Sequence, residues 1–212
     1  MDQQIEYTKK ARHGNNNDMV DENNIRQVAG CLPIDLANQR ILLISSSNKN
    51  KDHWVIPKGG WEDDETQAQA ALRETWEEAG LKGRITRHLG VFEEATKKQI
   101  KGHHWIFEMQ IDEVCKKFPE KKKRERRWYT YDEALVVVKG QYMRDAIMLS
   151  SLNPANQSGA PPFVPTTLIA PSSVIRPDAP FPSSSSTATA PPSEIKQSSS
   201  FSNGLKALFK KG

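Results

Sequence analysis

The chain has 212 residues, of which 30 are Lys or Arg and 26 are Asp or Glu, and its net charge is +4. Its two cysteines, Cys31 and Cys115, form no zinc-ligand spacing and no disulfide framework. There is no secretory signal pattern, and no apolar run approaches the roughly 20 residues that span a membrane. These features argue against a disulfide-stapled secreted domain and against a membrane-spanning protein, and the expected location is cytoplasmic and nuclear.

The composition divides the chain into three parts. Residues 1–24 are predicted to be a flexible N-terminal segment, and residues 25–152 a folded domain of the α/β class. Residues 153–212 are rich in Ser, Pro, Thr and Ala, with too little apolar material to offset their ordering entropy, so this tail is predicted to be disordered. Its end, residues 198–212, is amphipathic and basic. It is either a disordered end or a short helix that binds a partner or an anionic surface.

Within the domain, strand-like and helix-like patterns alternate in α/β order. Strands are expected at Gln27–Ile34, Arg40–Ser45, Trp54–Ile56, Arg84–Glu93, His104–Val114 and Arg127–Thr130. Helices are expected at Gln67–Ala79, Asp132–Lys139 and Tyr142–Leu152. The pattern predicts a mixed sheet but does not define its crossings.

The functional prediction depends on one window, Gly59–Leu81, with the sequence GGWEDDETQAQAALRETWEEAGL. A helix over Gln67–Ala79 places small and apolar side chains in a stripe that is predicted to be buried, namely Ala68, Ala71, Leu72, Thr75 and Ala79. The ends of this helix are also marked. Thr66 and Gln69 are suited to a capping box, and Gly80 is suited to the left-handed residue that ends a helix.

Three glutamates of this window, Glu74, Glu77 and Glu78, lie three and four residues apart on the other side of the helix. Their carboxylates are therefore expected to converge. Like charges so close repel one another, and a divalent cation such as Mg²⁺, which prefers oxygen ligands, relieves the repulsion. The plain alternative is a solvated acidic face, which is the common meaning of a charge run.

The glutamates belong to a longer pattern, G-x5-E-x7-R-E-U-x-E-E-x-G-U, where U is a bulky apolar residue. The sequence matches it from Gly59 to Leu81, with Thr75 as the one departure at a U position. On this pattern the chain resembles the Nudix hydrolases. The resemblance implies the Nudix fold, a mixed β-sheet between α-helices. It also implies hydrolysis of a diphosphate with the help of a bound metal ion.

The resemblance assigns the metal, Mg²⁺ or Mn²⁺ in its place, to the catalytic glutamates Glu74, Glu77 and Glu78. Arg73 is expected to hold the glycine loop and to orient a catalytic carboxylate. Glu65 is expected to support Arg73 or to add an outer metal contact. Gly59 and Gly60 are expected to let backbone N–H groups approach phosphate oxygens.

Charge outside the window favours a polyanionic substrate. The run Lys116–Arg127 holds eight basic residues and two glutamates, a local charge of +6. An alternative meaning is a nuclear import signal at Lys121–Arg124. Because Arg124, Arg126 and Arg127 lead directly into the apolar run WYTY, at least one guanidinium is expected to be held in a fixed orientation, which favours phosphate recognition.

The runs RQVAGCLPI, ILLISSS, HWVIPKGGWE and RETWEEAGLKG, with the basic run before WY, narrow the resemblance. Over about Arg26 to Leu152 the chain is similar to fungal diphosphoinositol polyphosphate phosphohydrolases, a subfamily that also includes diadenosine polyphosphate hydrolases. This implies cleavage of inositol pyrophosphates, and also of diadenosine penta- and hexaphosphates and polyphosphate. The substrate-binding residues are expected to be Arg26, Ser45, Ser46, Ser47, Lys58, Gly59, Gly60 and Arg126.

Two alternatives stay open. A dinucleoside polyphosphate hydrolase or a messenger-RNA decapping enzyme would use the same motif, with a base stacked on Trp54, Trp61 or Trp105. A protein of another class, an adaptor that binds polyphosphate or RNA, would keep only a vestigial site. The favoured reading is a monomeric enzyme for a small polyanion, with no DNA partner.

Overall fold

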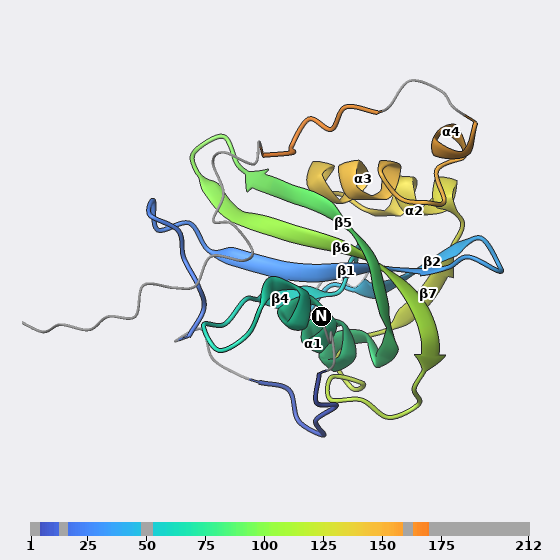
Figure 1. Cartoon of the computed structure of the whole chain (residues 1–212), viewed down its shortest axis with the longest axis horizontal. Coiled ribbons are helices and arrows are strands. Elements are labelled where there is room, and N and C mark those ends of the chain that lie inside the picture. The colour runs from blue at the N-terminus through green and yellow to red at the C-terminus, as the bar shows by residue number, and fades with distance from the viewer. Residues whose placement is uncertain (1–4, 13–16, 48–52, 159–162, 170–212) are drawn as a thin grey trace, which may run out of the picture. The chain divides into compact units, whose positions relative to one another are not determined.

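The computed structural model describes residues 5–12, 17–47, 53–158 and 163–169 (Figure 1). Its strands are β1 (Gln27–Asp35), β2 (Arg40–Ser45), β3 (Trp54–Val55), β4 (Lys58–Gly60), β5 (Leu81–Ala95), β6 (Ile100–Val114) and β7 (Arg126–Tyr129). Its helices are α1 (Gln67–Ala79), α2 (Tyr131–Val137), α3 (Gln141–Met148) and α4 (Pro154–Gln157). The predicted order of elements is confirmed, except that β5 and β6 are longer, α3 is shorter, and β4 and α4 were not expected.

The seven strands form one mixed sheet with the path β3-β2-β1-β6-β5, in which β4 pairs with β1 and β7 with β2. β1 and β6 are parallel, and the other pairs are antiparallel. Helix α1 covers one face of the sheet, and α2 and α3 cover the other (Figure 1). The predicted architecture, a mixed sheet between helices, is confirmed.

Helix α1 begins and ends where the sequence places its capping residues. Thr66 accepts a hydrogen bond from the Gln69 amide while the Gln69 side chain accepts from the Thr66 amide, so the predicted capping box is present. Gly80 ends the helix at φ 63°, where a side chain would be strained and would also overlap the Phe118 ring. The two caps define where α1 begins and ends.

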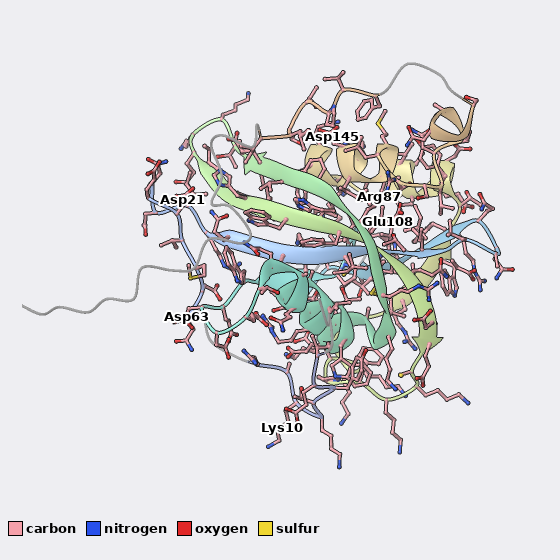
Figure 2. The ribbon with its side chains drawn as sticks, viewed as in Figure 1. Lys10, Asp21, Asp63, Arg87, Glu108 and Asp145 are labelled. Atoms are coloured by element: carbon pink, nitrogen blue, oxygen red, sulfur yellow. The ribbon has the colours of Figure 1, made fainter. Side chains whose placement is uncertain are left out.

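The face under α2 and α3 contains charged groups that an alternating strand would be expected to expose. Glu108 on β6 is buried, and it accepts hydrogen bonds from the Ser151 amide and hydroxyl and from Arg87. Figure 2 shows Arg87 and Glu108 side by side beneath these helices. The sheet is covered on both faces at this point, so Glu108 is buried along with its apolar neighbours, whereas Asp112 and Glu113 near the end of β6 are exposed.

Residues past 152, where the sequence predicted the end of the domain, also contact the sheet. Residues 163–169 run along the outer edge of β5. There the Glu93 amide donates to the Thr167 carbonyl (2.7 Å) and the Ile169 amide to the Val91 carbonyl (2.8 Å). The buried Asp145 accepts from the Thr167 amide (2.8 Å) and from the Thr166 and Thr167 hydroxyls. The predicted amphipathic end lies outside the described residues.

The N-terminal 24 residues, expected to be flexible, make defined contacts with the domain where they are described. Residues 5–12 lie against α1, and Asp18 pairs with Arg26 at the start of the sheet. In the part of the chain that the structure describes, no helix is long and apolar enough to cross a membrane.

A chain that ends after Ser158 should be less stable than one that ends after Ile169, because Asp145 loses its hydrogen bonds from Thr166 and Thr167. The expected loss is about 1–3 kcal/mol in the free energy of unfolding. Urea denaturation of the two truncated proteins measures it. Equal stabilities would mean that residues 163–169 contribute nothing to the domain.

His104 should make the protein acid-sensitive. Its Nε2 bonds to Glu94 (3.0 Å), its ring stacks on Tyr142, and its buried Nδ1 has no partner among the described residues. Burial lowers the pKa of His104 to about 4. Between about pH 6.5 and that value, the unfolded chain binds a proton at residue 104 and the folded chain does not, so acid favours unfolding.

The free energy of unfolding should therefore fall as the pH drops through this range, by on the order of 3 kcal/mol from His104 alone. His104→Gln removes the titrating group and should flatten the dependence in denaturation series across the same range. Parallel pH curves for the two proteins would contradict the assignment.

Candidate active site

The glycine turn lies against α1 because β4 pairs with β1 directly before the helix begins. A side-chain carbon at Gly59 would overlap the Glu74 carboxylate, and one at Gly60 would overlap Asp18. The Lys58 amide donates to Glu78 Oε2 at 2.9 Å. The bare backbone thus brings the turn into direct contact with the acidic side of α1.

Arg73 ties this turn to the acidic residues. Its guanidinium donates to Glu65 Oε1 (2.6 Å), to Glu74 Oε1 (2.6 Å) and to the Gly60 carbonyl (2.8 Å). Burial works against the charge of Arg73, but the bonds to Glu65 and Glu74 outweigh it and raise its pKa. Arg73 therefore stays charged, and it holds both the loop and a carboxylate.

The three glutamates are not a solvated face. The side chains of Glu74, Glu77 and Glu78 are only 14%, 3% and 10% exposed. Burial raises the pKa of Glu77 and of Glu78 to about 7 each, and it also raises the pKa of Glu74. Buried carboxylates destabilise the fold unless partners compensate their charge.

Each of these carboxylates has its own protein partner. Glu74 pairs with Arg73, and Glu78 pairs with Arg124 as well as with the Lys58 amide. Both oxygens of Glu77 accept from the Arg12 amide. The predicted convergence is therefore incomplete: among the described residues, no three His, Cys, Asp or Glu side chains are gathered closely enough to hold a metal ion.

The donor chemistry nevertheless suits a hard divalent cation. Three buried carboxylates within two turns of one helix supply oxygen ligands, and the absence of a side chain at Gly59 lets the glycine turn lie directly against Glu74. A dication would offset the burial of charge that raises their pKa values. Glu74, Glu77 and Glu78 are the residues that would hold it.

The expected substrate-binding residues divide into two groups. Lys58, Gly59 and Gly60 lie beside the acidic residues, whereas the others lie along the strand ends around them. Ser45 is buried and bonds to the backbone of Glu125, the Ser46 amide donates to the His53 carbonyl, and Ser47 is exposed. Arg26 pairs with Asp18 at 2.6 Å.

Arg126 has a different position from the one expected. Its guanidinium donates to the carbonyls of Ala79 and Cys115, both at 2.9 Å, and lies over the Phe118 ring. These contacts tie the end of α1 to the segment that follows β6. Instead, Arg124 of the same basic run reaches the acidic residues, where it bonds to Glu78 and to the Ser45 carbonyl.

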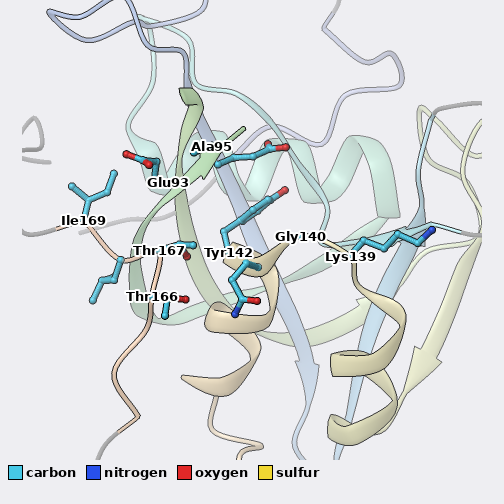
Figure 3. A pocket seen from close by; sticks show the side chains of 11 residues that line it. Glu93, Ala95, Lys139, Gly140, Tyr142, Thr166, Thr167 and Ile169 are labelled. Atoms are coloured by element: carbon cyan, nitrogen blue, oxygen red, sulfur yellow. The ribbon is translucent and has the colours of Figure 1, made fainter. Parts of the chain in front are cut away.

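A cavity of about 530 Å³ lies between the end of β5, the start of α3 and residues 166–169 (Figure 3). Lys139, Tyr142 and Glu94 line it. The Lys58 ammonium points toward this side. Burial lowers its pKa, but the bond to Tyr142 and the charges of Glu78 and Glu94 outweigh burial and raise it. Sequence analysis missed these lining residues, because they belong to no local motif.

Comparisons with known proteins agree with this geometry. A family model described as the NUDIX domain matches residues 24–150. The chain is 39% identical to Nudix hydrolase 12, mitochondrial, of Arabidopsis thaliana, over 59% of this chain and 72% of that protein. It is 29% identical to diphosphoinositol polyphosphate phosphohydrolase 2 of Homo sapiens, over 68% of this chain and 82% of that protein.

A solved structure shows the same fold. The crystal structure of a NUDIX hydrolase from Nitrosomonas europaea superposes with a TM-score of 0.51, with 24% sequence identity, and covers 65% of this chain and 74% of that one. The match of the family model spans more than half of the chain and includes β1, the glycine turn, α1 and α3. The chain therefore belongs to the Nudix hydrolase family.

Proposed function

We propose that the protein hydrolyses diphosphate groups of inositol pyrophosphates with the help of Mg²⁺. The observation that carries the proposal is the set of three buried carboxylates on α1, Glu74, Glu77 and Glu78, directly beside the glycine turn. A fold that buries this much like charge is well explained by a metal-dependent phosphoanhydride hydrolase. Diadenosine penta- and hexaphosphates and polyphosphate are proposed as further substrates.

When bound, the metal would neutralise phosphate charge and activate a water molecule. The protein contributes orientation. Arg73 holds Glu74 relative to the Gly60 carbonyl, and the Lys58 amide holds Glu78. The bare backbone of Gly59 allows a phosphate group to approach the carboxylates without a side chain between them.

The substrate class is supported by charge and by similarity. Relatives that are 29% identical carry the name diphosphoinositol polyphosphate phosphohydrolase. The cavity at the start of α3 is lined by Lys139 together with Glu93 and Glu94, and the Lys58 ammonium lies close to its Tyr142. We infer that Lys58 and Lys139 provide cations for a substrate with many phosphates.

The nucleotide alternatives need an aromatic surface for a base. Trp54, Trp61 and Trp105 are 8%, 2% and 2% exposed, and each packs in the core. Trp61 and Trp105 also pack edge to face against each other. None of these three rings is available for stacking, which favours an inositol-based substrate over a cap or an adenine.

An adaptor that binds polyphosphate or RNA would not need the buried acidic residues. They would repel a polyanion and destabilise the fold. Turnover of an inositol pyrophosphate with and without Mg²⁺ decides between the two classes. A direct comparison of kcat/KM for an inositol pyrophosphate, diadenosine hexaphosphate and polyphosphate would rank the substrates.

Replacing Glu78 with Gln should leave a folded protein that is at least about a hundredfold slower, because it removes one charge that would hold the metal. Glu77→Gln should behave similarly. Glu113→Gln, an exposed glutamate on β6, is the matched control and should keep full activity. Initial rates as a function of Mg²⁺ concentration measure the effect, and near-normal turnover by a folded double variant of Glu77 and Glu78 would refute the assignment.

Arg126→Ala should reduce activity by disturbing the fold near the site, whereas Lys139→Ala should reduce it by weakening substrate binding. The first removes bonds to two carbonyls and should lower kcat/KM by a similar factor for an inositol pyrophosphate and for a two-phosphate substrate. The second should raise KM mainly for the inositol pyrophosphate, and less at high salt. Steady-state kinetics with both substrates test this, and the reverse pattern would restore Arg126 as a phosphate-binding residue.

A further inference from the structure

Residues 5–12 lie across α1 and are anchored there by an aromatic contact. The ring of Tyr7 packs edge to face on Trp76, with centroids 5.1 Å apart, and the Trp76 indole N–H donates to the Thr8 carbonyl at 2.8 Å. The Lys82 ammonium lies 5.2 Å from the Tyr7 ring centre. A segment that composition alone marks as flexible is therefore seated on the helix that carries the acidic residues.

The far end of this segment touches the acidic residues directly. The backbone amide of Arg12 donates to both oxygens of Glu77, at 3.1 and 3.0 Å, across 65 positions of sequence. Glu77 is the most buried of the three carboxylates, and its nearest cation, Arg73, is at 4.0 Å. Among the described residues, the Arg12 amide is the one hydrogen-bond donor to the Glu77 carboxylate.

Arg12 is fixed from a second direction as well. Its guanidinium donates to Glu62 Oε2 (2.8 Å) and to Asp64 Oδ1 (3.0 Å), both in the loop between β4 and α1. That loop also contains Glu65, the partner of Arg73. The Arg12 side chain is 43% exposed, so these ion pairs contribute little energy.

We propose that residues 5–12 form a strap that positions Glu77 for the metal, through the backbone amide of Arg12. The inference rests on the proposed metal site. Glu74 is held by Arg73, and Glu78 by the Lys58 amide and Arg124, whereas Glu77 depends on a donor from the N-terminal segment. Outer partners of metal ligands typically account for about 10- to 100-fold in metal affinity.

The test separates the amide from the side chain of Arg12. Arg12→Pro removes the N–H donor, whereas Arg12→Ala keeps it and removes only the guanidinium. Mn²⁺ binding to the full chain, followed by electron paramagnetic resonance without substrate, gives the dissociation constant. Arg12→Pro should bind Mn²⁺ at least about tenfold more weakly, and Arg12→Ala within about threefold of the wild type.

Glu77→Gln sets the scale for loss of the ligand itself. In that background Arg12→Pro should cause no further loss, because the two changes act on one contact. Tyr7→Ala, which releases the other end of the strap and leaves residue 12 unchanged, should also weaken Mn²⁺ binding. It serves in place of Arg12→Pro if the proline variant fails to fold.

The outcomes distinguish the two proposals. If Glu77→Gln weakens Mn²⁺ binding and Arg12→Pro does not, the strap is overturned and the metal site stands. Tighter binding by Arg12→Pro would also overturn it, because the amide would then compete with the metal. If Glu77→Gln binds Mn²⁺ as the wild type does, the metal assignment fails and the strap fails with it.

Discussion

The structure around α1 is organised by the need to compensate three buried carboxylates. A charge taken out of water is stable only when a partner replaces its hydration. Here the partners come from separate parts of the chain: Arg73 from the helix itself, the Lys58 amide from the glycine turn, and Arg124 from the loop before β7. The N-terminal segment supplies the fourth, the amide of Arg12. The position of each of these segments thus follows from the charge of one helix face.

Much of this could be predicted from the sequence, because the signals are local. The capping box at Thr66, the left-handed Gly80 and the bounds of α1 all depend on residues within a few positions of one another. The mixed sheet also follows from the alternation of elements. The order in which the strands pair does not follow from it. The parallel pairing of β1 with β6 joins residues about 75 positions apart, and no local pattern encodes it.

The site was less predictable than the fold. Spacing on a helix places Glu74, Glu77 and Glu78 near one another, but it does not reveal which partner each carboxylate takes. Arg124 and Arg126 are two positions apart in the same basic run, yet one reaches Glu78 and the other binds the carbonyls of Ala79 and Cys115. Arg124 lies in the loop before β7, whereas Arg126 is the first residue of that strand, and the composition of the run does not distinguish the two positions.

Residues 163–169 affect whether the sheet can associate with strands of other chains. β5 is the last strand on the path of the sheet, and a free outer strand offers unpaired amides and carbonyls to any other extended chain. The bonds of Glu93 with Thr167 and of Val91 with Ile169 occupy part of that row. The stretch after α4 therefore shields the sheet from strand-to-strand self-association, and proteolytic loss of it would leave this edge open to aggregation.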